Sequence, residues 1–524
     1  MTSDVRTPSR QPHRPGPPAR PDHLVVVLLD SLNRHLLEAY GGTEFETPNI
    51  ARFATESLRF RAHHVGSLPC MPARHDILVG ALDFPWRPWG SIEVWEDAIT
   101  RALHEAGVTT MLVSDHPHLF ETGGENYHTD FTAWQYERGH EGDPWRTAPD
   151  PTWVGTPTLP AERAPFPFPY DMSRTWFRAE EDFPGPKTMS AAAAWIRNSA
   201  AGHERFFLLV DEFDPHEPFD TPEPYARMYD PDWEGPLCIW PPYVVDALAS
   251  GALDARKARH IRANYGSKLT MIDAWFGRLL DALDDAGVAS TTAVVLCTDH
   301  GHFLGEHDVF GKPGAPIYRE MGHIPLLVRW PGQAPRDVDA LTTSVDIHAT
   351  IADLFGARAG HRVHGRSLLP LIEGTADSVR ELALFGYWGR HVGVTDGHTR
   401  YLKGCGPDTG NYPLTVWSNR WSTMPIHAFP HIRLPRPDGR ATLRTMPGTE
   451  VPVIVQPYEP GDRLPFWAAG GPPTQSYLFD VDRDPAETEN RSGEHGAAAW
   501  DDALAGALRE IGAPEELFDR LGLG

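Results

Sequence analysis

Cysteine, proline and arginine stand close together in residues 67–80, Ser-Leu-Pro-Cys-Met-Pro-Ala-Arg-His-Asp-Ile-Leu-Val-Gly. Pro72 suits the first turn of a helix, where its missing N–H group is no loss. Cys70 would then lie at the N-terminus of the helix, with Arg74 one turn later on the same face. Unpaired backbone N–H groups and the helix dipole favour an anion at that end. The spacing therefore predicts a reactive side chain and a fixed positive charge where an oxyanion can bind.

A carboxylate and an imidazole, Asp299 and His300, form a second candidate site. They follow residues 292–297, an apolar run typical of a strand buried on both faces. Side by side, these two ligand types suit a divalent cation. Asp30 ends a similar run and would complete the cluster.

Two further aspartates, Asp115 and Asp211, also follow apolar runs directly or begin within two residues of them. Parallel strands end at one edge of a sheet, where ligands bind, so four strands are expected to bring carboxylates to the same edge. An aspartate after a strand also serves as a helix cap, which is the alternative for each of them.

Apolar runs that predict strands alternate with amphipathic runs that predict helices over most of the chain. This order is typical of an α/β fold, with a large, mostly parallel sheet sandwiched by helices. Later strand candidates follow one another without helices, which predicts a smaller C-terminal antiparallel sheet. The expected domains are a disordered tail over 1–22, an α/β domain over 23–375 and a smaller α+β subdomain over 376–524, in which residues 404–470 are irregular covering loops.

Composition limits the class of protein. The 524 residues are 41% hydrophobic and 23% charged, as in globular proteins, and the formal net charge of −24 argues against a general surface for nucleic acid or anionic membranes. The four cysteines are widely spaced without a C-x-x-C pair, which fits neither a disulfide framework nor a cysteine-rich zinc site. The first 22 residues lack the apolar core of a signal peptide. These features predict a soluble cytoplasmic protein that binds neither nucleic acid nor membranes.

The pattern C-x-P-x-R at Cys70, Pro72 and Arg74 resembles the signature of type I sulfatases and of the phosphonate monoester hydrolases, in the alkaline phosphatase-like superfamily. Residues 297–312, which include Asp299, His300 and Lys312, are similar to the block that carries metal ligands and the active-site lysine in that family. Other segments match in the family order, so the resemblance extends over about residues 24–490: they are 47–53, 214–219, 325–332, 345–353 and 477–485.

The resemblance implies an activity and its cofactors. In that family a formylglycine-generating enzyme oxidises the cysteine, and the hydrated aldehyde is the nucleophile. The chain is then expected to hydrolyse small-molecule sulfate esters with a formylglycine derived from Cys70 and one divalent ion, which is calcium, magnesium, manganese or zinc. Residues 23–375 become a sulfatase-like catalytic domain. The implied metal ligands are Asp30, Cys70, Asp299 and His300, and the implied catalytic residues are Cys70, Arg74, Lys312 and His216, the last being preferred over Lys312 as proton donor to the leaving oxygen.

The chain departs from the common sulfatase pattern in places. Ser31 replaces a second acid, and His300 stands where many sulfatases have asparagine. Both features, like the C-x-P-A-R form of the motif, are similar to the phosphonate hydrolase branch, so a phosphonate monoester or phosphodiester hydrolase is an alternative. His116 and His118 appear in place of the usual lysine–histidine segment, and we expect them to bind substrate.

An alternative of another class is a catalytically silent, metal-binding scaffold in which Cys70 is an unmodified buried thiol. The substrate itself is not defined by any motif. Several tryptophans in the long irregular segments either wall a pocket for a sugar or aryl group or pack under loops. These are Trp134, Trp145, Trp153, Trp176, Trp417 and Trp421.

Overall fold

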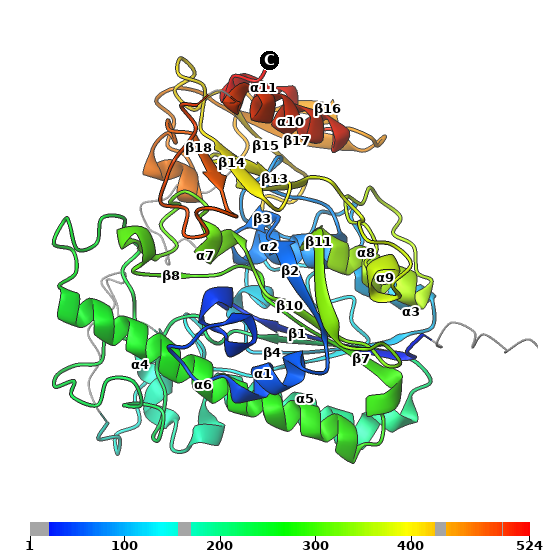
Figure 1. Cartoon of the computed structure of the whole chain (residues 1–524), viewed down its shortest axis with the longest axis vertical. Coiled ribbons are helices and arrows are strands. Elements are labelled where there is room, and N and C mark those ends of the chain that lie inside the picture. The colour runs from blue at the N-terminus through cyan, green and yellow to red at the C-terminus, as the bar shows by residue number, and fades with distance from the viewer. Residues whose placement is uncertain (1–19, 156–168, 425–435, 495) are drawn as a thin grey trace, which may run out of the picture.

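The computed structural model describes residues 20–155, 169–424, 436–494 and 496–524, so most of the tail predicted over 1–22 lies outside the described residues. A large sheet crosses the molecule (Figure 1). Its neighbouring strands are parallel except around β10, which is antiparallel to both β2 and β7. The strand order is β11 (Arg336–Thr343), β2 (Leu58–His64), β10 (Leu326–Arg329), β7 (Thr292–Cys297), β1 (His23–Leu29), β6 (Phe206–Glu212), β4 (Thr109–Ser114) and β5 (Ala133–Tyr136).

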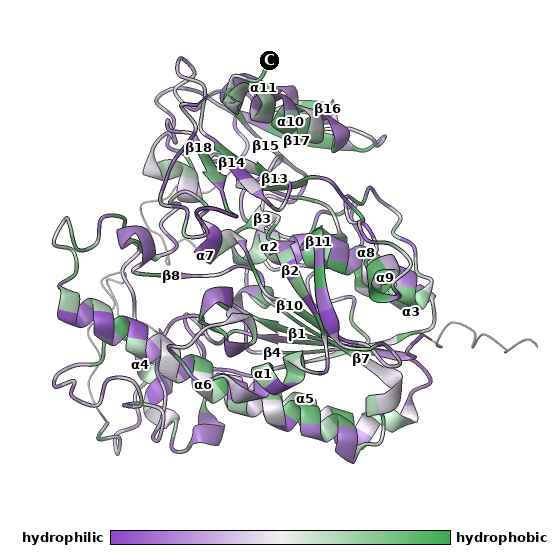
Figure 2. Ribbon diagram, in the orientation of Figure 1, coloured by the Kyte–Doolittle hydropathy of each residue, from purple (hydrophilic) through white to green (hydrophobic). Residues whose placement is uncertain are grey.

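Helices cover both faces of this sheet, which confirms the predicted fold class. Successive side chains of a strand point to opposite faces. Val25 and Val27 of β1 therefore join one core, whereas Leu24 and Val26 join the other. Figure 2 shows these central strands as hydrophobic and the covering helices as mixed. The first core is covered by α1 (Pro48–Ala54), α5 (Pro184–Ser199) and α6 (Ala255–Asp285), the second by α2 (Cys70–Val79), α3 (Ile99–Glu105), α8 (Val345–Phe355) and α9 (Leu369–Ile372).

The described residues also form three smaller sheets, two of them largely in the C-terminal part of the chain. Strand β3 pairs with β12 and leads directly into α2, so the five-stranded sheet fixes the position of Cys70. The five-stranded sheet has the order β18 (Tyr477–Asp480), β14 (Thr399–Lys403), β13 (Val392–Thr395), β12 (Ala383–Tyr387) and β3 (Ser67–Leu68). The three-stranded sheet has the order β15 (Leu414–Ser418), β17 (Pro452–Tyr458) and β16 (Thr442–Thr445). The two-stranded sheet consists of β8 (Phe303–Leu304) and β9 (Phe310–Gly311).

Of the other helices in the described residues, α4 (Pro169–Ser173) adds Tyr170 to the first core, whereas α7 (Arg319–Gly322), α10 (Ala497–Glu510) and α11 (Glu515–Leu521) pack in the smaller clusters. Residues 497–521, for which the sequence favours one helical segment, thus form two helices. Among the described residues, we find no helix with both the length and the apolar character that crossing a membrane requires.

Two local expectations were wrong. The sequence favours a helix that begins near Thr47 and runs to about Leu58, but α1 ends at Ala54, and Leu58–His64 form β2, a strand that was not expected although its apolar and polar residues alternate. Residues 404–470 contain β15, β16 and β17, so this part is not only irregular loop. β16 is exposed along its length and therefore gave no alternating apolar pattern.

Helix α2 is anchored at its C-terminal half by a buried histidine. The Nδ1 atom of His75 lies 3.1 Å from the carbonyl oxygen of Ala81, and Nε2 lies 2.8 Å from a carboxylate oxygen of Glu96. Both ring nitrogens thus face acceptors, which requires the imidazolium form. Burial opposes this charge, but Asp83 and Glu96 outweigh it and raise the pKa of His75 to about 9.

We expect this ion pair to make stability depend on pH. Since the folded pKa lies above the ordinary value of 6.5, the stabilisation is complete below pH 6.5 and is lost as pH rises to about 9. The loss should be about 3 kcal/mol in the free energy of unfolding. Urea unfolding of the wild type and of His75→Gln at both pH values measures it, with the exposed His398 as the matched His398→Gln control. Equal pH dependence in the wild type and His75→Gln would contradict the assignment.

Candidate active site

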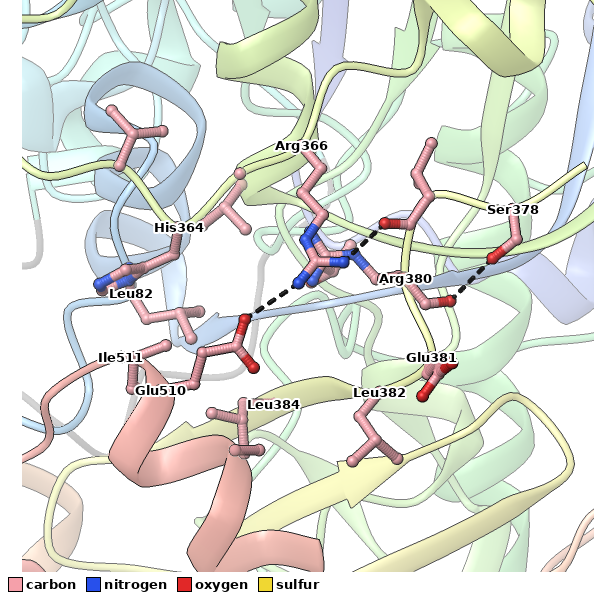
Figure 3. Close-up of a pocket in the computed structure, with 16 residues that line it drawn as sticks. Leu82, His364, Arg366, Ser378, Arg380, Glu381, Leu382, Leu384, Glu510 and Ile511 are labelled. Atoms are coloured by element: carbon pink, nitrogen blue, oxygen red, sulfur yellow. Dashed lines mark hydrogen bonds and ion pairs between the residues drawn. The ribbon is translucent and has the colours of Figure 1, made fainter. Parts of the chain in front are cut away.

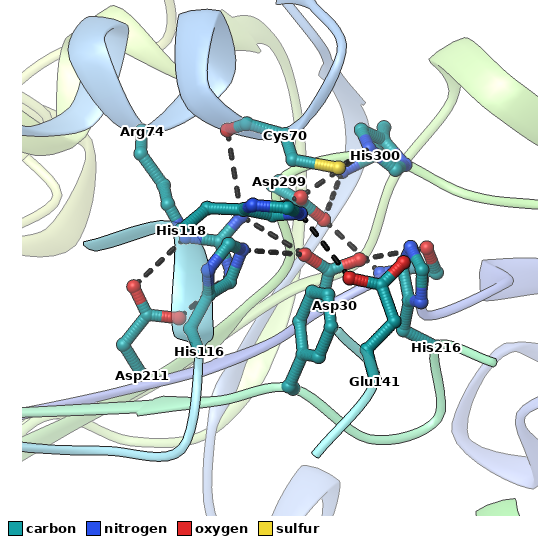
Figure 4. Close-up of polar contacts among 12 residues, drawn as sticks. Asp30, Cys70, Arg74, His116, His118, Glu141, Asp211, His216, Asp299 and His300 are labelled. Atoms are coloured by element: carbon teal, nitrogen blue, oxygen red, sulfur yellow. Dashed lines mark hydrogen bonds and ion pairs between the residues drawn. The ribbon is translucent and has the colours of Figure 1, made fainter. Parts of the chain in front are cut away.

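The predicted metal ligands converge at the carboxyl edge of the large sheet (Figure 4). Asp30 follows β1, Asp299 and His300 follow β7, and Cys70 is the first residue of α2. One potential ligand atom from each of the four side chains lies within 4.8 Å of the others, and all four residues are buried. The Sγ atom of Cys70 is 3.3 Å from Nε2 of His300. The structure therefore brings together residues from three distant parts of the sequence.

Arg74 is the centre of this cluster. Its Nε and Nη2 atoms donate to both carboxylate oxygens of Asp211, at 2.8 and 2.7 Å. Its Nη1 lies 2.7 Å from Asp299 Oδ2 and 3.0 Å from Asp30 Oδ2. The guanidinium is 1% exposed, so water cannot replace these partners. Arg74 thus holds carboxylates from three strands at fixed positions and, in this arrangement, has little donor capacity left for a substrate.

The electrostatics of the four-residue cluster suit a divalent cation. Burial disfavours the charged form of Asp299, and the negative charge of Asp30 beside it disfavours that form further. Together they raise the pKa of Asp299 to about 8. Asp30 Oδ2 accepts no hydrogen bond of good geometry, although Arg74 is near. Carboxylates and an imidazole are ligands for calcium, magnesium, manganese or zinc. A bound divalent ion would remove the repulsion between the two aspartates, so the residues fit such an ion.

Cys70 in its unmodified form is not a nucleophile. Burial first, and then the negative charge of Asp30, raises the pKa of the Cys70 thiol well above its ordinary value, so the sulfur stays protonated. Lys312 Nζ lies 3.6 Å from this sulfur and donates to Ser31 Oγ at 3.3 Å. Ser31 Oγ in turn donates to Asp30 at 2.7 Å. Lys312 thus places a positive charge beside residue 70, as the sequence predicts.

His216 approaches the cluster from the segment after β6. Its Nδ1–H donates to the backbone carbonyl oxygen of Glu217 at 2.7 Å, and its ring stacks on Phe213 with centroids 4.2 Å apart. Figure 4 shows the side chain beside Asp30. Burial lowers the pKa of His216 to about 4, so the imidazole is neutral at pH 7. Because Nδ1 carries the hydrogen, Nε2 is free of it in this state.

The two histidines expected to bind substrate have different surroundings. His116 Nε2 lies 3.4 Å from Asp30 Oδ2, inside the buried cluster. His118 lies between two carboxylates, with Nδ1 2.5 Å from Glu121 and Nε2 3.3 Å from Glu141. Burial opposes its charge, but these carboxylates raise the pKa of His118 to about 10. His118 is therefore a permanent cation at neutral pH.

Asp115 does not join the metal cluster. It lies at the expected sheet edge, but its Oδ1 accepts a hydrogen bond from the backbone N–H of Phe213 at 2.8 Å. Burial and the charge of Asp214 raise the pKa of Asp115 well above its ordinary value. Asp211 binds only Arg74 within the cluster. Of the four aspartates at the ends of the strands, Asp30 and Asp299 alone supply the potential metal ligands of this cluster.

Some residues around the site could not be found from the sequence. Glu141 belongs to an irregular insertion without periodicity, and only the fold places it beside His118. Two tryptophans also touch site residues: the ring of Trp89 is edge-on to His118 at 4.8 Å, and Trp467 Nε1–H donates to the Lys312 carbonyl oxygen at 2.8 Å.

All six tryptophans proposed from the sequence as a pocket wall have packing partners elsewhere. Trp134 contacts Phe120, Trp145 contacts Phe177, and Trp417 contacts Trp86. Trp153 and Trp176 pack against the guanidinium groups of Arg174 and Arg146, and Trp421 against a small hydrophobic cluster that includes Trp388.

A cavity of about 550 Å³ lies apart from the cluster, beside α10 (Figure 3). Two arginines point into it. Arg366 donates to Glu510 at 3.0 Å, and Arg380 is paired with Asp346. Each of these arginines therefore already has a carboxylate partner.

The comparisons with known proteins agree with this geometry. A model of the Sulfatase family matches residues 22–357. The chain is 27% identical over 387 residues to the multifunctional alkaline phosphatase superfamily protein PehA of Trinickia caryophylli, covering 64% of this chain and 74% of that protein. It is 25% identical over 395 residues to iduronate 2-sulfatase of Homo sapiens, covering 68% of each chain.

The fold is also that of known structures. The phosphonate monoester hydrolase of Agrobacterium radiobacter superposes with a TM-score of 0.63 at 18% identity, covering 94% of this chain and 95% of that chain. The phosphonate monoester hydrolase of Silicibacter pomeroyi superposes with a TM-score of 0.60 at 22% identity, covering 93% of this chain and 95% of that chain. From the family match and the shared fold, the chain is an enzyme of the Sulfatase family, within the alkaline phosphatase-like superfamily.

Proposed function

We propose that the chain hydrolyses sulfate esters with a formylglycine derived from Cys70 and one divalent ion held by Asp30, residue 70, Asp299 and His300. The observation that carries the proposal is the convergence of these four side chains within 4.8 Å of one another. Relatives named as sulfatases, including iduronate 2-sulfatase, support sulfate esters as the substrate class. When bound, the ion would supply positive charge against the developing negative charge of the transferred group.

The protein's own residues would perform the remaining tasks. The hydrated aldehyde of residue 70, made by a formylglycine-generating enzyme, would attack sulfur in line with the leaving oxygen. Lys312 would stabilise the transferred oxygens, and Arg74 would keep the carboxylates in place. His118 would line the approach to the cluster, with its charge compensated by Glu121 and Glu141, and His116 would orient Asp30. His216 is then the preferred proton donor, because an anion bound beside it would raise the pKa of its imidazole.

The phosphonate monoester or phosphodiester alternative is supported by the surroundings of Asp30. Ser31 supplies a neutral hydroxyl, which donates to Asp30 at 2.7 Å and accepts from Lys312 at 3.3 Å, where a second acid would add negative charge. A phosphodiester or phosphonate monoester has the same single negative charge as a sulfate monoester, but shares it between two non-bridging oxygens instead of three, and a more positive site favours this more concentrated charge. The relative named as multifunctional and the phosphonate monoester hydrolase structures agree with this alternative.

A substrate panel distinguishes the two functions. The converted enzyme, made with a formylglycine-generating enzyme, would be assayed on para-nitrophenyl sulfate, bis-para-nitrophenyl phosphate and para-nitrophenyl phenylphosphonate. We expect kcat/KM for the sulfate ester to exceed that for the phosphorus esters by about tenfold or more, a difference of about 1.4 kcal/mol in transition-state binding. Dominant turnover of the phosphonate or phosphodiester would replace the first function by the second.

The predicted cytoplasmic location stays a prediction.

The proton donor is identified by its dependence on the leaving group. Poor leaving groups need protonation in the transition state, whereas para-nitrophenolate does not. We expect His216→Ala to lower kcat by about 100-fold for an alkyl sulfate, and much less for para-nitrophenyl sulfate. Lys312→Ala should lower both rates similarly. The reverse pattern would assign the proton transfer to Lys312.

A further inference from the structure

We propose that Lys268 is a positioning residue that holds His216 in its catalytic position. Lys268 is one of five lysines in the chain and lies in the middle of α6, where it is 3% exposed. Its Nζ donates to the backbone carbonyl oxygen of Pro218 at 2.7 Å and to that of His216 at 3.2 Å. It also forms an ion pair with Asp214. The proposal rests on the role of His216 in the proposed function.

The three partners of Lys268 are His216 itself and one residue on each side of it. Asp214 is two residues before it, and Pro218 is two residues after it. An ammonium group has three N–H donors, so one side chain satisfies all three acceptors. His140 Nε2, 2.8 Å from Asp214, provides a further donor to the same carboxylate. Through these contacts, the buried ammonium group of Lys268 links residues 214–218, which include the proposed acid His216, to helix α6.

The contacts of Lys268 with the backbone also affect the position of the His216 imidazole ring. The ring direction of His216 is set by its Nδ1–H bond to the Glu217 carbonyl oxygen, at 2.7 Å. Lys268 holds the carbonyl oxygens of the residues on either side of Glu217. If this segment shifted, Nε2 would move relative to the leaving oxygen, whereas the side chains of Asp299 and Cys70 are held by other partners, Arg74 and His300. Displacement by a fraction of an ångström is enough to slow a proton transfer.

The test must distinguish a displaced His216 from a general loss of stability caused by mutating Lys268. Lys268→Met alone would leave Asp214 buried without its cation, so the test variant is Lys268→Met combined with Asp214→Asn, which removes both charges. Lys268→Arg keeps a cation and serves as the conservative rescue. Lys257→Met, which removes an exposed lysine from the same helix, is the matched control.

A mutant cycle in the converted enzyme gives the decisive measurement. On an alkyl sulfate, the Lys268→Met/Asp214→Asn variant should lose about 10- to 100-fold in kcat, with KM changed by less than about twofold. On para-nitrophenyl sulfate the loss should be much smaller. In the His216→Ala background the same pair of substitutions should cause no further loss, because Lys268 acts through His216. Equal losses in both backgrounds, or equal losses for both leaving groups, would overturn the proposal.

A crystal structure tests the positioning role of Lys268 independently of the proposed function. If the converted wild type hydrolyses none of the esters, the proposed function fails, but the position of His216 can still be measured. A crystal structure of the Lys268→Met/Asp214→Asn variant should show the His216 ring displaced or in several orientations, with Arg74 and Asp299 unmoved. A His216 ring that keeps its position in this variant would overturn the positioning role whatever the activity.

Discussion

Replacement of Cys70 by serine is expected to lower steady-state ester hydrolysis by about 1,000-fold or more. A serine hydroxyl at the start of α2 can still attack, since Arg74 and Lys312 remain around it. It has no second hydroxyl, however, so the sulfate or phosphonate group cannot leave by regeneration of an aldehyde. The variant should therefore react once and stop, with the transferred group covalently bound to residue 70.

Mass spectrometry of the peptide that contains residue 70 measures both states. In the wild type made with a formylglycine-generating enzyme, the aldehyde should replace the thiol. In Cys70→Ser incubated with para-nitrophenyl sulfate, the peptide should gain one sulfate group, and para-nitrophenol should appear in a single burst. Cys405→Ser, at a buried cysteine outside the cluster, is the control. A wild-type peptide that shows only thiol would favour the silent scaffold, and steady turnover by Cys70→Ser would exclude the formylglycine mechanism.

The sequence predicts those site residues that lie within or next to a single helix or strand. Cys70 and Arg74 lie one helical turn apart, and Asp299 and His300 follow a strand whose six residues are all buried. Such patterns define both the element and the direction of the side chain. The convergence of Asp30 with them follows from the parallel order of β1 and β7, which the alternation of strands and helices also predicts.

The rest depends on contacts between residues far apart in the chain. Lys268 lies in a helix with no local sign of a polar role, and its partners are about 50 residues earlier. Glu141 stands in an insertion without periodicity. Likewise, the alternation of arginine and histidine with apolar residues in β2 does not identify its neighbours, which are the antiparallel β10 and the parallel β11. Neither these pairings nor the partners of Lys268 leave a short-range signal.

Removal of the divalent ion is the second change with a large expected effect. Chelation should abolish activity and lower the thermal stability of the converted enzyme. Without the ion, the carboxyl groups of Asp30 and Asp299 face each other in a buried site, where burial first and then the charge of Asp30 raise the pKa of Asp299 to about 8. An ion at a thousand times its Kd would contribute about 4 kcal/mol to the free energy of unfolding. Re-addition of calcium, magnesium, manganese or zinc, one at a time, shows which ion restores kcat.

Elemental analysis and variants test the ligand set directly. We expect one ion per chain in the wild type and none in Asp299→Ala, because the remaining ligands leave a partly open site. Asp115→Asn is the matched control: Asp115 ends a strand at the same sheet edge, and burial raises the pKa of its carboxyl, so asparagine resembles its neutral form. This control should keep its ion and its activity. Full activity after exhaustive chelation, or a normal metal content in Asp299→Ala, would contradict a metal site at Asp30, residue 70, Asp299 and His300.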